Sequence, residues 1–545
     1  MKSKGDVSQQ AKPATMYLMK NAGRRWLLYF YFACHLLPGC REYIPDDVES
    51  ALAQSGENRN EIMAAIRHYN RDEKDSLKLR ALYFLITNMG TKYAYNVEID
   101  LDRGKENSPF DIFSFFREAR RDSLLGMKQK ELRALFPAFS FRRHEPKCDL
   151  ATITREMLVE NIDYAFSAWD KPWARQLTFE EFCEYLLPYR SDGEPLSLWR
   201  KRISGEMAPW LSTKKITQRR NWLVLINDSL RNRFHYHIAR LKYIPFELTP
   251  KQIDSLGGGT CEDLTMIASC WLKSAGIPVV NDFTPAWGSG YYKGQGHSWL
   301  SYLDENRVFY PFNPSYANPQ PDSIRFGRDL LPKVYRHTFK EQPHSLAVRE
   351  REGVAVPGFL NSPNILDVTD LYIRTVNIRV RLDNNPTNEK YAYLGVFSAF
   401  GWKVVAYGDI SNNTEVEFSK MGPGVLYMPL LYVDGELVPA GRPLIGLSDT
   451  SRIIFGNRRE KRYDSLKVPV GLVQLKQGDR FGLFVWDSNH WEFIYGGGVK
   501  TDDFITLRNL FKHSVYIIKR ANKYDGSFEF IQRPFCVDSD TLRVL

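Results

Sequence analysis

A glycine turn that leads into an apolar helix is the feature that most constrains the fold of this chain. Residues 257–260 read Gly-Gly-Gly-Thr, a run that lets the backbone turn sharply, and Cys261 follows directly. Gly276 and Pro278 end the segment, as they commonly do after a helix C-terminus. The spacing of the apolar residues predicts a helix with one buried face and with Cys261 at its N-terminus. Those residues are Leu264, Ile267, Ala268, Trp271, Leu272 and Ala275.

The position of Cys261 predicts a reactive thiol. At a helix N-terminus the partial positive charge and the free N–H groups favour a thiolate, and the same N–H groups can stabilise a tetrahedral oxyanion. Cys270 lies nine residues later, on the opposite side of the helix, and is interpreted as a packing residue. A buried small side chain without chemistry is the alternative for Cys261 taken alone.

A thiol nucleophile needs a base, and His297 has a matching context. The run Gly296-His-Ser-Trp-Leu-Ser-Tyr302 predicts a strand in which His297, Trp299 and Ser301 share one face. The next strand is expected over 307–312, and Asn313 follows it. An amide there can orient the imidazole and fix its tautomer. We therefore predict Cys261 as nucleophile, His297 as base and Asn313 as the orienting residue.

These motifs, in this order, resemble the transglutaminase-like core, a papain-like thiol fold. The resemblance covers about residues 250–320 and rests on Gly-x-Cys261, Gly-Ile-Pro278, Gly-His297-Ser-Trp and Phe-Asn313-Pro-Ser. It implies acyl transfer through a Cys261 thioester, with a protein or peptide substrate and no cofactor. The family usually has Asp where Asn313 stands, and an amide carries no charge to stabilise imidazolium. Asp304, one loop away, is the alternative third member of the site. It can also be interpreted as a solvated residue in the turn between the two strands.

The chain divides into three compositional blocks, which predict a multidomain α+β protein. Residues 40–245 are expected to be mainly helical; within them, Thr178 and Glu181 form a capping-box pattern. Residues 246–345 hold the transglutaminase-like core, and the polar stretch 340–364 is a linker. Two all-β sandwich units are expected at 365–460 and 461–545, related by a degenerate repeat, with chance similarity as the alternative. The repeat pairs Gly395-Val-Phe397, Trp402 and 425–428 with Gly482-Leu-Phe484, Trp491 and 515–518.

The N-terminus predicts an export signal. Lys20, Arg24 and Arg25 precede thirteen mostly apolar residues, too few to span a bilayer. The stretch ends Leu37-Pro38-Gly39-Cys40 and resembles a bacterial lipobox, which implies a signal peptide over 1–39, lipidation of Cys40, and anchoring to the outer membrane or cell surface. A buried helix start with an incidental cysteine is the alternative. With helices before the core and β-domains after it, the layout resembles the transglutaminase-domain lipoproteins of gut Bacteroidetes.

Composition bears on the partners. Residues 1–39 hold six of the 74 basic and one of the 64 acidic residues, so the formal net charge of +10 falls to about +5 for the rest. We see no dense basic run beyond the N-terminus, so no nucleic-acid partner is expected. No metal-ligand spacing and no phosphate loop is found, so no metal or nucleotide cofactor is expected.

Two functions of different classes remain. The favoured one is a surface-anchored cysteine protease, amidase or transglutaminase-type acyltransferase, with hydrolysis favoured over cross-linking because water competes as the acceptor. The alternative is a catalytically weak or inactive scaffold whose β units bind glycan or protein. The predicted substrate contacts are aromatic and amide side chains in and around the glycine-rich loop before His297: Trp287, Tyr291, Tyr292, Gln295 and Trp299.

Overall fold

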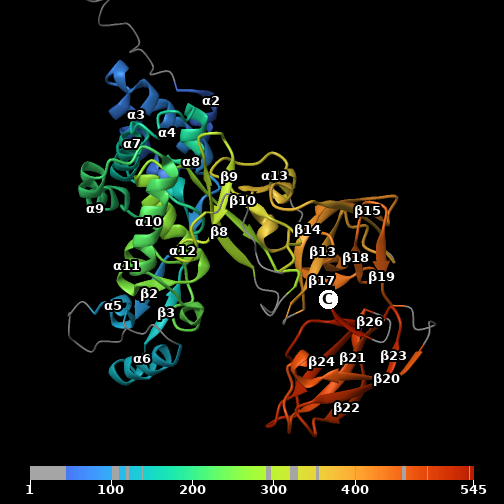
Figure 1. Cartoon of the computed structure of the whole chain (residues 1–545). Helices are drawn as coiled ribbons and strands as arrows, with labels where there is room; N and C mark the ends of the chain where they lie inside the picture. Colours follow the sequence, from blue (N-terminus) through green and yellow to red (C-terminus); the bar gives the residue numbers. More distant parts are fainter. Residues whose placement is uncertain are drawn as a thin grey trace, which may run out of the picture. The chain divides into compact units, whose positions relative to one another are not determined.

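The structure is a computed structural model (Figure 1). It describes residues 44–100, 110–117, 122–137, 139–289, 296–319, 329–350, 355–383, 385–398, 401–456, 462–487, 489–538 and 541–545. The predicted signal segment 1–39 and the predicted lipidation site Cys40 lie outside these residues, as do Tyr291, Tyr292 and Gln295. The chain divides into two compact units, residues 1–50 and 51–545, and the second unit holds the predicted core. In the part of the chain that is described, no helix is long and apolar enough to cross a membrane.

The first half of the second unit is mainly helical, as predicted, with a few short strand pairs (Figure 1). Helix α8 begins with the predicted capping box, in which Thr178 Oγ1 accepts from the Glu181 N–H and the Glu181 carboxylate accepts from the Thr178 N–H. The helices are α3 (Arg59–Tyr69), α4 (Ser76–Asn88), α5 (Ile112–Phe116), α6 (Asp122–Leu135), α7 (Arg155–Trp169), α8 (Phe179–Tyr185), α9 (Arg200–Thr213), α10 (Arg219–Arg233) and α11 (Pro250–Leu256). The strands are β1 (Tyr93–Ala94), β2 (Val97–Asp100), β3 (Ser140–Arg143), β4 (Lys147–Cys148), β5 (His235–Tyr236) and β6 (Gly258–Gly259).

Helix α12 (Cys261–Ser274) is the helix predicted from the glycine turn, and it lies deeper than expected. Every residue from Asp263 to Ser274 is buried, not one face alone. The helix packs against α7, α9, α10 and α11 and against two strands of the central sheet. Gly276, with a φ of 75°, turns the chain out of the helix in the left-handed region that glycine adopts without strain.

The central sheet has five antiparallel strands in the order β11-β10-β7-β8-β9. The two strands predicted around His297 are β8 and β9, and they pair as expected, with Leu300 opposite Phe312. Strand β11 lies beyond residue 345, where the core was predicted to end. The central sheet therefore includes residues that follow the expected linker at 340–364. The bounds are β7 (Val279–Thr284), β8 (His297–Leu303), β9 (Phe309–Phe312), β10 (Tyr335–His337) and β11 (Ile365–Asp367), with a short α13 (Leu346–Arg349) between the last two.

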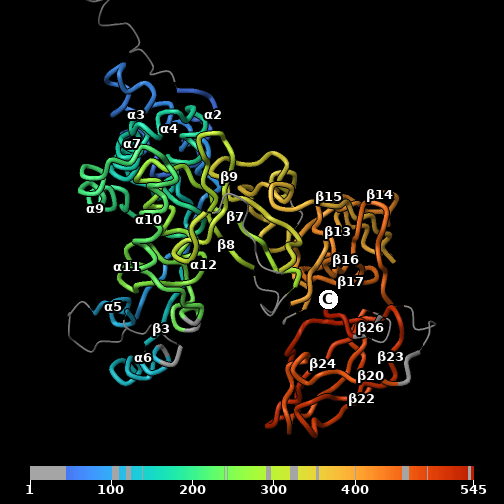
Figure 2. Tube along the Cα trace, in the orientation of Figure 1, coloured from blue at the N-terminus to red at the C-terminus, as the bar shows by residue number. Residues whose placement is uncertain are grey.

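The C-terminal part, orange to red in Figure 2, is β-rich, and its strand pairing repeats. In the first set β12 pairs with β15, and β13 pairs with both β14 and β16; in the second set β20 pairs with β23, and β21 pairs with both β22 and β24. Residues 395–397 and 482–484 occupy the equivalent strands β13 and β21. The sets differ in one link: β14 also pairs with β15, which joins the first set into one sheet, whereas β20 and β23 form a separate sheet in the second set. The first set comprises β12 (Val376–Arg381), β13 (Tyr391–Ser398), β14 (Gly401–Ser411), β15 (Glu415–Met421), β16 (Leu426–Val433), β17 (Glu436–Pro439), β18 (Leu444–Gly446) and β19 (Arg452–Ile454). The second comprises β20 (Arg462–Pro469), β21 (Arg480–Asp487), β22 (His490–Gly498), β23 (Phe504–Phe511), β24 (Tyr516–Ala521), β25 (Phe528–Phe530), β26 (Phe535–Asp538) and β27 (Thr541–Val544).

Candidate active site

The glycine run before Cys261 is required by close backbone packing. Gly257 caps α11 with a φ of 76°, in the left-handed region. Gly258 and Gly259 then form β6, which runs parallel to β5. A Cβ on Gly258 would lie 2.1 Å from the carbonyl oxygen of His235. The turn therefore brings the chain tightly against its neighbour before α12 begins at Cys261.

The first turn of α12 is fixed by a buried ion pair. Asp263 Oδ2 accepts from the Thr260 N–H at 2.7 Å, which completes a capping box. The same carboxylate accepts from Arg240 Nε at 2.6 Å and from Arg240 Nη2 at 2.5 Å. Arg240 also donates to the carbonyls of Ile244 and Phe246, at 2.7 and 2.8 Å. Arg240 and Asp263 are 3 % and 5 % exposed. The loop before Cys261 is therefore held by a buried ion pair with two hydrogen bonds.

The Cys261 thiol is held in its neutral form. Its Sγ donates to Glu262 Oε2 at 3.2 Å, and the backbone N–H of Ser298 hydrogen-bonds to the sulfur. Burial, followed by the nearby Glu262 carboxylate, raises the pKa of Cys261 to about 12. The predicted low thiol pKa is therefore wrong for this arrangement. The contact from the Ser298 N–H lowers the pKa of the thiol, as predicted for an N–H donor, but burial and the negative charge of Glu262 raise it by more.

His297 is oriented by Asn313. The His297 Nε2 lies 2.9 Å from Asn313 Oδ1. An amide oxygen only accepts, so this contact requires a proton on Nε2 and leaves Nδ1 as the free base. Burial lowers the pKa of His297, against an opposing hydrogen bond to Asn313 and the charge of Glu262. The site thus holds a neutral imidazole in one tautomer.

Cys261 is linked to the strand that carries His297, but not to the imidazole itself. The thiol sulfur contacts the amide of Ser298, the residue that follows His297 on β8. Within the described residues no hydrogen bond joins the sulfur to the imidazole. Asp304, the alternative third member, accepts from the N–H groups of Asn306 and Val308 in its own turn, at 2.9 and 2.8 Å. Its carboxylate is therefore engaged there, and among the described residues the side-chain hydrogen bond of the imidazole goes to Asn313.

Two tryptophans pack on the imidazole. The Trp287 ring stacks on His297 at a centroid distance of 5.8 Å, and the Trp299 ring lies at 5.9 Å. Trp299 is fully buried and Trp287 is 6 % exposed. Trp299 therefore has no surface for a substrate, which corrects its predicted role as a substrate contact. Trp287 is almost fully buried as well, and besides the imidazole it packs in a buried apolar cluster with Trp299, Leu331, Val334 and Val368.

A polar network beneath Trp299 was not foreseen from the sequence. Trp299 Nε1 donates to the Tyr372 hydroxyl at 2.9 Å, and that hydroxyl donates to the buried carboxylate of Asp282. Asp282 also accepts from Ser301 Oγ at 2.8 Å and from Arg336 at 2.7 and 2.9 Å. The network fixes the tryptophan that packs on His297, and its Tyr372 lies 73 residues beyond Trp299.

The candidate site opens into a cavity of about 720 Å³. Glu262, His297 and Ser298 line one part of it, and Trp402 and Lys403 of β14 line another. Trp402 also packs edge-on against Trp486 at 5.6 Å, so these aromatic side chains of the β units contact one another. The cavity thus combines an opposed pair of charges with apolar walls. The apolar lining includes Phe283, Pro285, Phe359, Val404 and Leu437.

The described residues contain no group of three or more His, Cys, Asp or Glu placed to hold a metal ion. No protein-family model matches the sequence, and no curated protein matches it. Among solved structures, the chain is similar to the transglutaminase of red sea bream, with 10 % identity. That match covers 70 % of this chain and 73 % of the other, with a TM-score of 0.12. A likeness this weak supports no conclusion about family or activity.

Proposed function

We propose that the protein is a cysteine acyl-transfer enzyme with a transglutaminase-like, papain-like core, which hydrolyses peptide or isopeptide amide bonds through a thioester on Cys261. The observation that carries the proposal is the hydrogen bond from His297 to Asn313, made beside a cysteine at a helix N-terminus. The site also faces a cavity large enough for several residues of an extended chain.

The reaction follows from the tautomer of the imidazole. The Cys261 proton passes to His297 Nδ1, and the sulfur attacks the amide carbon. The imidazolium then gives this proton to the leaving amine as the carbon–nitrogen bond breaks, which leaves a thioester. His297 next takes a proton from water, whose oxygen attacks the thioester carbon and releases the acid. The sulfur recovers the proton from His297, so no other reactant is consumed.

Glu262 controls the first step. In the resting site it accepts the thiol hydrogen bond, so the proton is directed away from His297. A substrate that draws the Glu262 carboxylate off the sulfur frees this proton for the imidazole. The thiol then becomes a nucleophile only when the cavity is filled.

Replacing Glu262 with glutamine is expected to speed alkylation of Cys261 by iodoacetamide at neutral pH about three- to tenfold. Removal of the adjacent charge lowers the thiol pKa, and each unit raises the thiolate fraction tenfold while it lowers the nucleophilicity of each thiolate about threefold. The measurement is the labelling rate against pH, read by mass spectrometry at each cysteine. Lys403→Gln removes the opposite charge from the same cavity and is expected to slow labelling or leave it unchanged. Equal labelling rates of Cys261 in the wild type and in Glu262→Gln would contradict the proposal that Glu262 controls the thiol.

A non-catalytic scaffold is the second candidate, and the hydrogen bond from Cys261 to Glu262 favours it, since it keeps the thiol neutral. In that case the β units would bind glycan or protein, and the core would only support them. The same labelling separates the candidates. If Cys261 reacts no faster than the buried Cys183 in any of these variants, the nucleophile assignment fails and the scaffold takes its place.

Asn313→Ala is expected to lower turnover by one to a few orders of magnitude, because the imidazole loses its orienting acceptor. Stability should fall by about 1–3 kcal/mol at most, the cost of one hydrogen-bonded group. Asn313→Asp keeps the acceptor and adds a charge that favours imidazolium, so it should retain activity. The measurements are kcat/KM and urea unfolding of each variant. Full activity in Asn313→Ala would show that this contact only supports the fold.

A further inference from the structure

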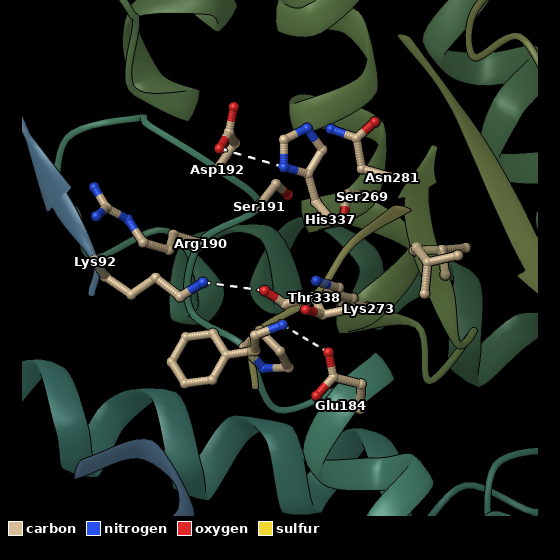
Figure 3. A pocket seen from close by; sticks show the side chains of 14 residues that line it. Lys92, Glu184, Arg190, Ser191, Asp192, Ser269, Lys273, Asn281, His337 and Thr338 are labelled. Carbon is tan, nitrogen blue, oxygen red and sulfur yellow. Dashed lines mark hydrogen bonds and ion pairs between the residues drawn. The ribbon is translucent and has the colours of Figure 1, made fainter. Parts of the chain in front are cut away.

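A second cavity, drawn in Figure 3, is lined by Ser269 and Lys273 of α12. It therefore lies beside the last turns of that helix, far along it from Cys261. Its volume is about 30 Å³, which is room for about two water-sized groups. Charged side chains from five parts of the chain line it. They are Lys92, Glu184, Arg190, Asp192, Lys273 and His337.

Most of these charged groups have direct partners. Arg190 Nη1 lies 3.1 Å from Asp149 Oδ1, in a pair whose side chains are 2 % and 1 % exposed. Lys92 Nζ donates to the Thr338 carbonyl at 3.0 Å, as Figure 3 shows. Glu184 accepts from the backbone N–H groups of residues 339 and 340, at 2.6 and 3.2 Å. Asp192 lies 3.4 Å from the His337 ring.

Lys273 is the exception. It is 6 % exposed, and among the described residues its ammonium has no hydrogen bond and no ion pair. Glu184 and Glu194 attract the ammonium electrostatically without a direct contact, while Arg200 repels it. The hydrogen-bond partners of Arg200 are all uncharged groups. Burial, followed by Arg200, lowers the pKa of Lys273 to about 8. Asn281 Oδ1, also in the cavity wall, is buried without a donor.

We propose that this cavity binds one small monovalent anion, a halide or a carboxylate, held by the Lys273 ammonium with one water beside it. Water alone would satisfy the hydrogen bonds of Lys273 but not its buried charge, and an isolated buried charge is costly. The accompanying water would give Asn281 Oδ1 its missing donor. The volume admits an ion of one to three heavy atoms and excludes sulfate and phosphate.

The proposal is tested by thermal unfolding of the whole protein at constant ionic strength, with sodium gluconate replaced stepwise by chloride, formate or sulfate. Stabilisation by a ligand of the folded state grows as RT ln(1 + [L]/Kd). Chloride or formate should therefore raise Tm along a saturable curve, whereas sulfate, which stabilises proteins by exclusion from their surface, should give no saturable rise. A saturable rise with chloride alone would identify a halide site, and one with formate alone a carboxylate site. A saturable rise with sulfate equal to that with chloride, or no saturable rise with either chloride or formate, overturns the proposal.

The matched variants are Lys273→Met and Lys171→Met. Lys171 is also a largely buried lysine with a pKa lowered to about 8, but it donates to the Ser274 carbonyl and lies outside the cavity. Lys273→Met should abolish the anion dependence, and Lys171→Met should keep it. Should Lys273→Met not fold, anomalous scattering from bromide in wild-type crystals decides for a halide: a peak within about 3.5 Å of Lys273 Nζ supports the site. The absence of that peak, together with no saturable Tm rise in formate, overturns the proposal. None of these readouts uses the activity of Cys261, so this proposal and the proposed enzyme function can fail separately.

Discussion

Cys261→Ala is expected to lower amide hydrolysis by about 10⁴-fold or more, because the reaction loses the atom that forms the thioester. The fold should be little affected. The thiol is only part-buried, and its side-chain hydrogen bond goes to the exposed Glu262 at the edge of the cavity. We therefore expect a change of about 1 kcal/mol or less in the free energy of unfolding.

The measurement is turnover of a quenched-fluorescence peptide library, together with mass spectrometry of acid-quenched enzyme. The wild type should carry an acyl adduct on Cys261 during turnover, and the alanine variant should carry none. Cys261→Ser is the matched variant, since it keeps a hydrogen-bond donor for Glu262 but is a poor nucleophile, and it should be nearly as inactive. Retention of more than a hundredth of the wild-type rate in both variants would exclude a Cys261 thioester.

Arg240→Met is expected to destabilise the protein by about 3–5 kcal/mol, the largest stability effect that we predict. The substitution leaves the Asp263 carboxylate buried without its cation, and breaking one side of a buried pair costs this much. It also frees the carbonyls of Ile244 and Phe246 from their donor. The loop that sets the start of α12 is therefore expected to loosen before the rest of the core.

Urea unfolding measures the stability, and the labelling rate of Cys261 in the folded range measures the loop. The double variant Arg240→Met/Asp263→Asn should recover part of the loss, because the uncompensated charge is gone. Arg379→Met breaks an exposed pair with Glu417 and should leave the unfolding midpoint unchanged. A loss for Arg240→Met as small as that for Arg379→Met would mean that the buried pair contributes nothing to the loop.

Features that depend on near neighbours in the sequence could be predicted. The start of α12 at Cys261 and its end before Gly276 follow from spacing and from glycine, and both are present. The pairing of β8 with β9 follows from two strands joined by a short turn, and it brings Asn313 to His297. The buried position of Cys270 follows from the helical period. In each case the signal spans fewer than twenty residues.

Features that depend on distant contacts could not be predicted. Arg240 reaches Asp263 across 23 residues, and no spacing rule links a loop arginine to a particular carboxylate. The visible signal was only that Asp263 occupies the third position of a capping box with Thr260. The prediction of a low pKa for the Cys261 thiol was wrong for a different reason. Glu262 was visible beside Cys261, but the effect of its charge depends on where its side chain points and on how little water surrounds the sulfur.

The link from Tyr372 to Trp299 has a consequence for how this core is inherited and moved between genes. A segment cut at residue 345, where the sequence suggested an end, would lack both β11 and the phenol that holds the tryptophan packed on His297. Recombination at that point would deliver the cysteine, the histidine and the asparagine, yet leave the histidine poorly supported. The smallest transferable cassette therefore extends to at least residue 372, so the expected linker 340–364 and strand β11 must travel with the core.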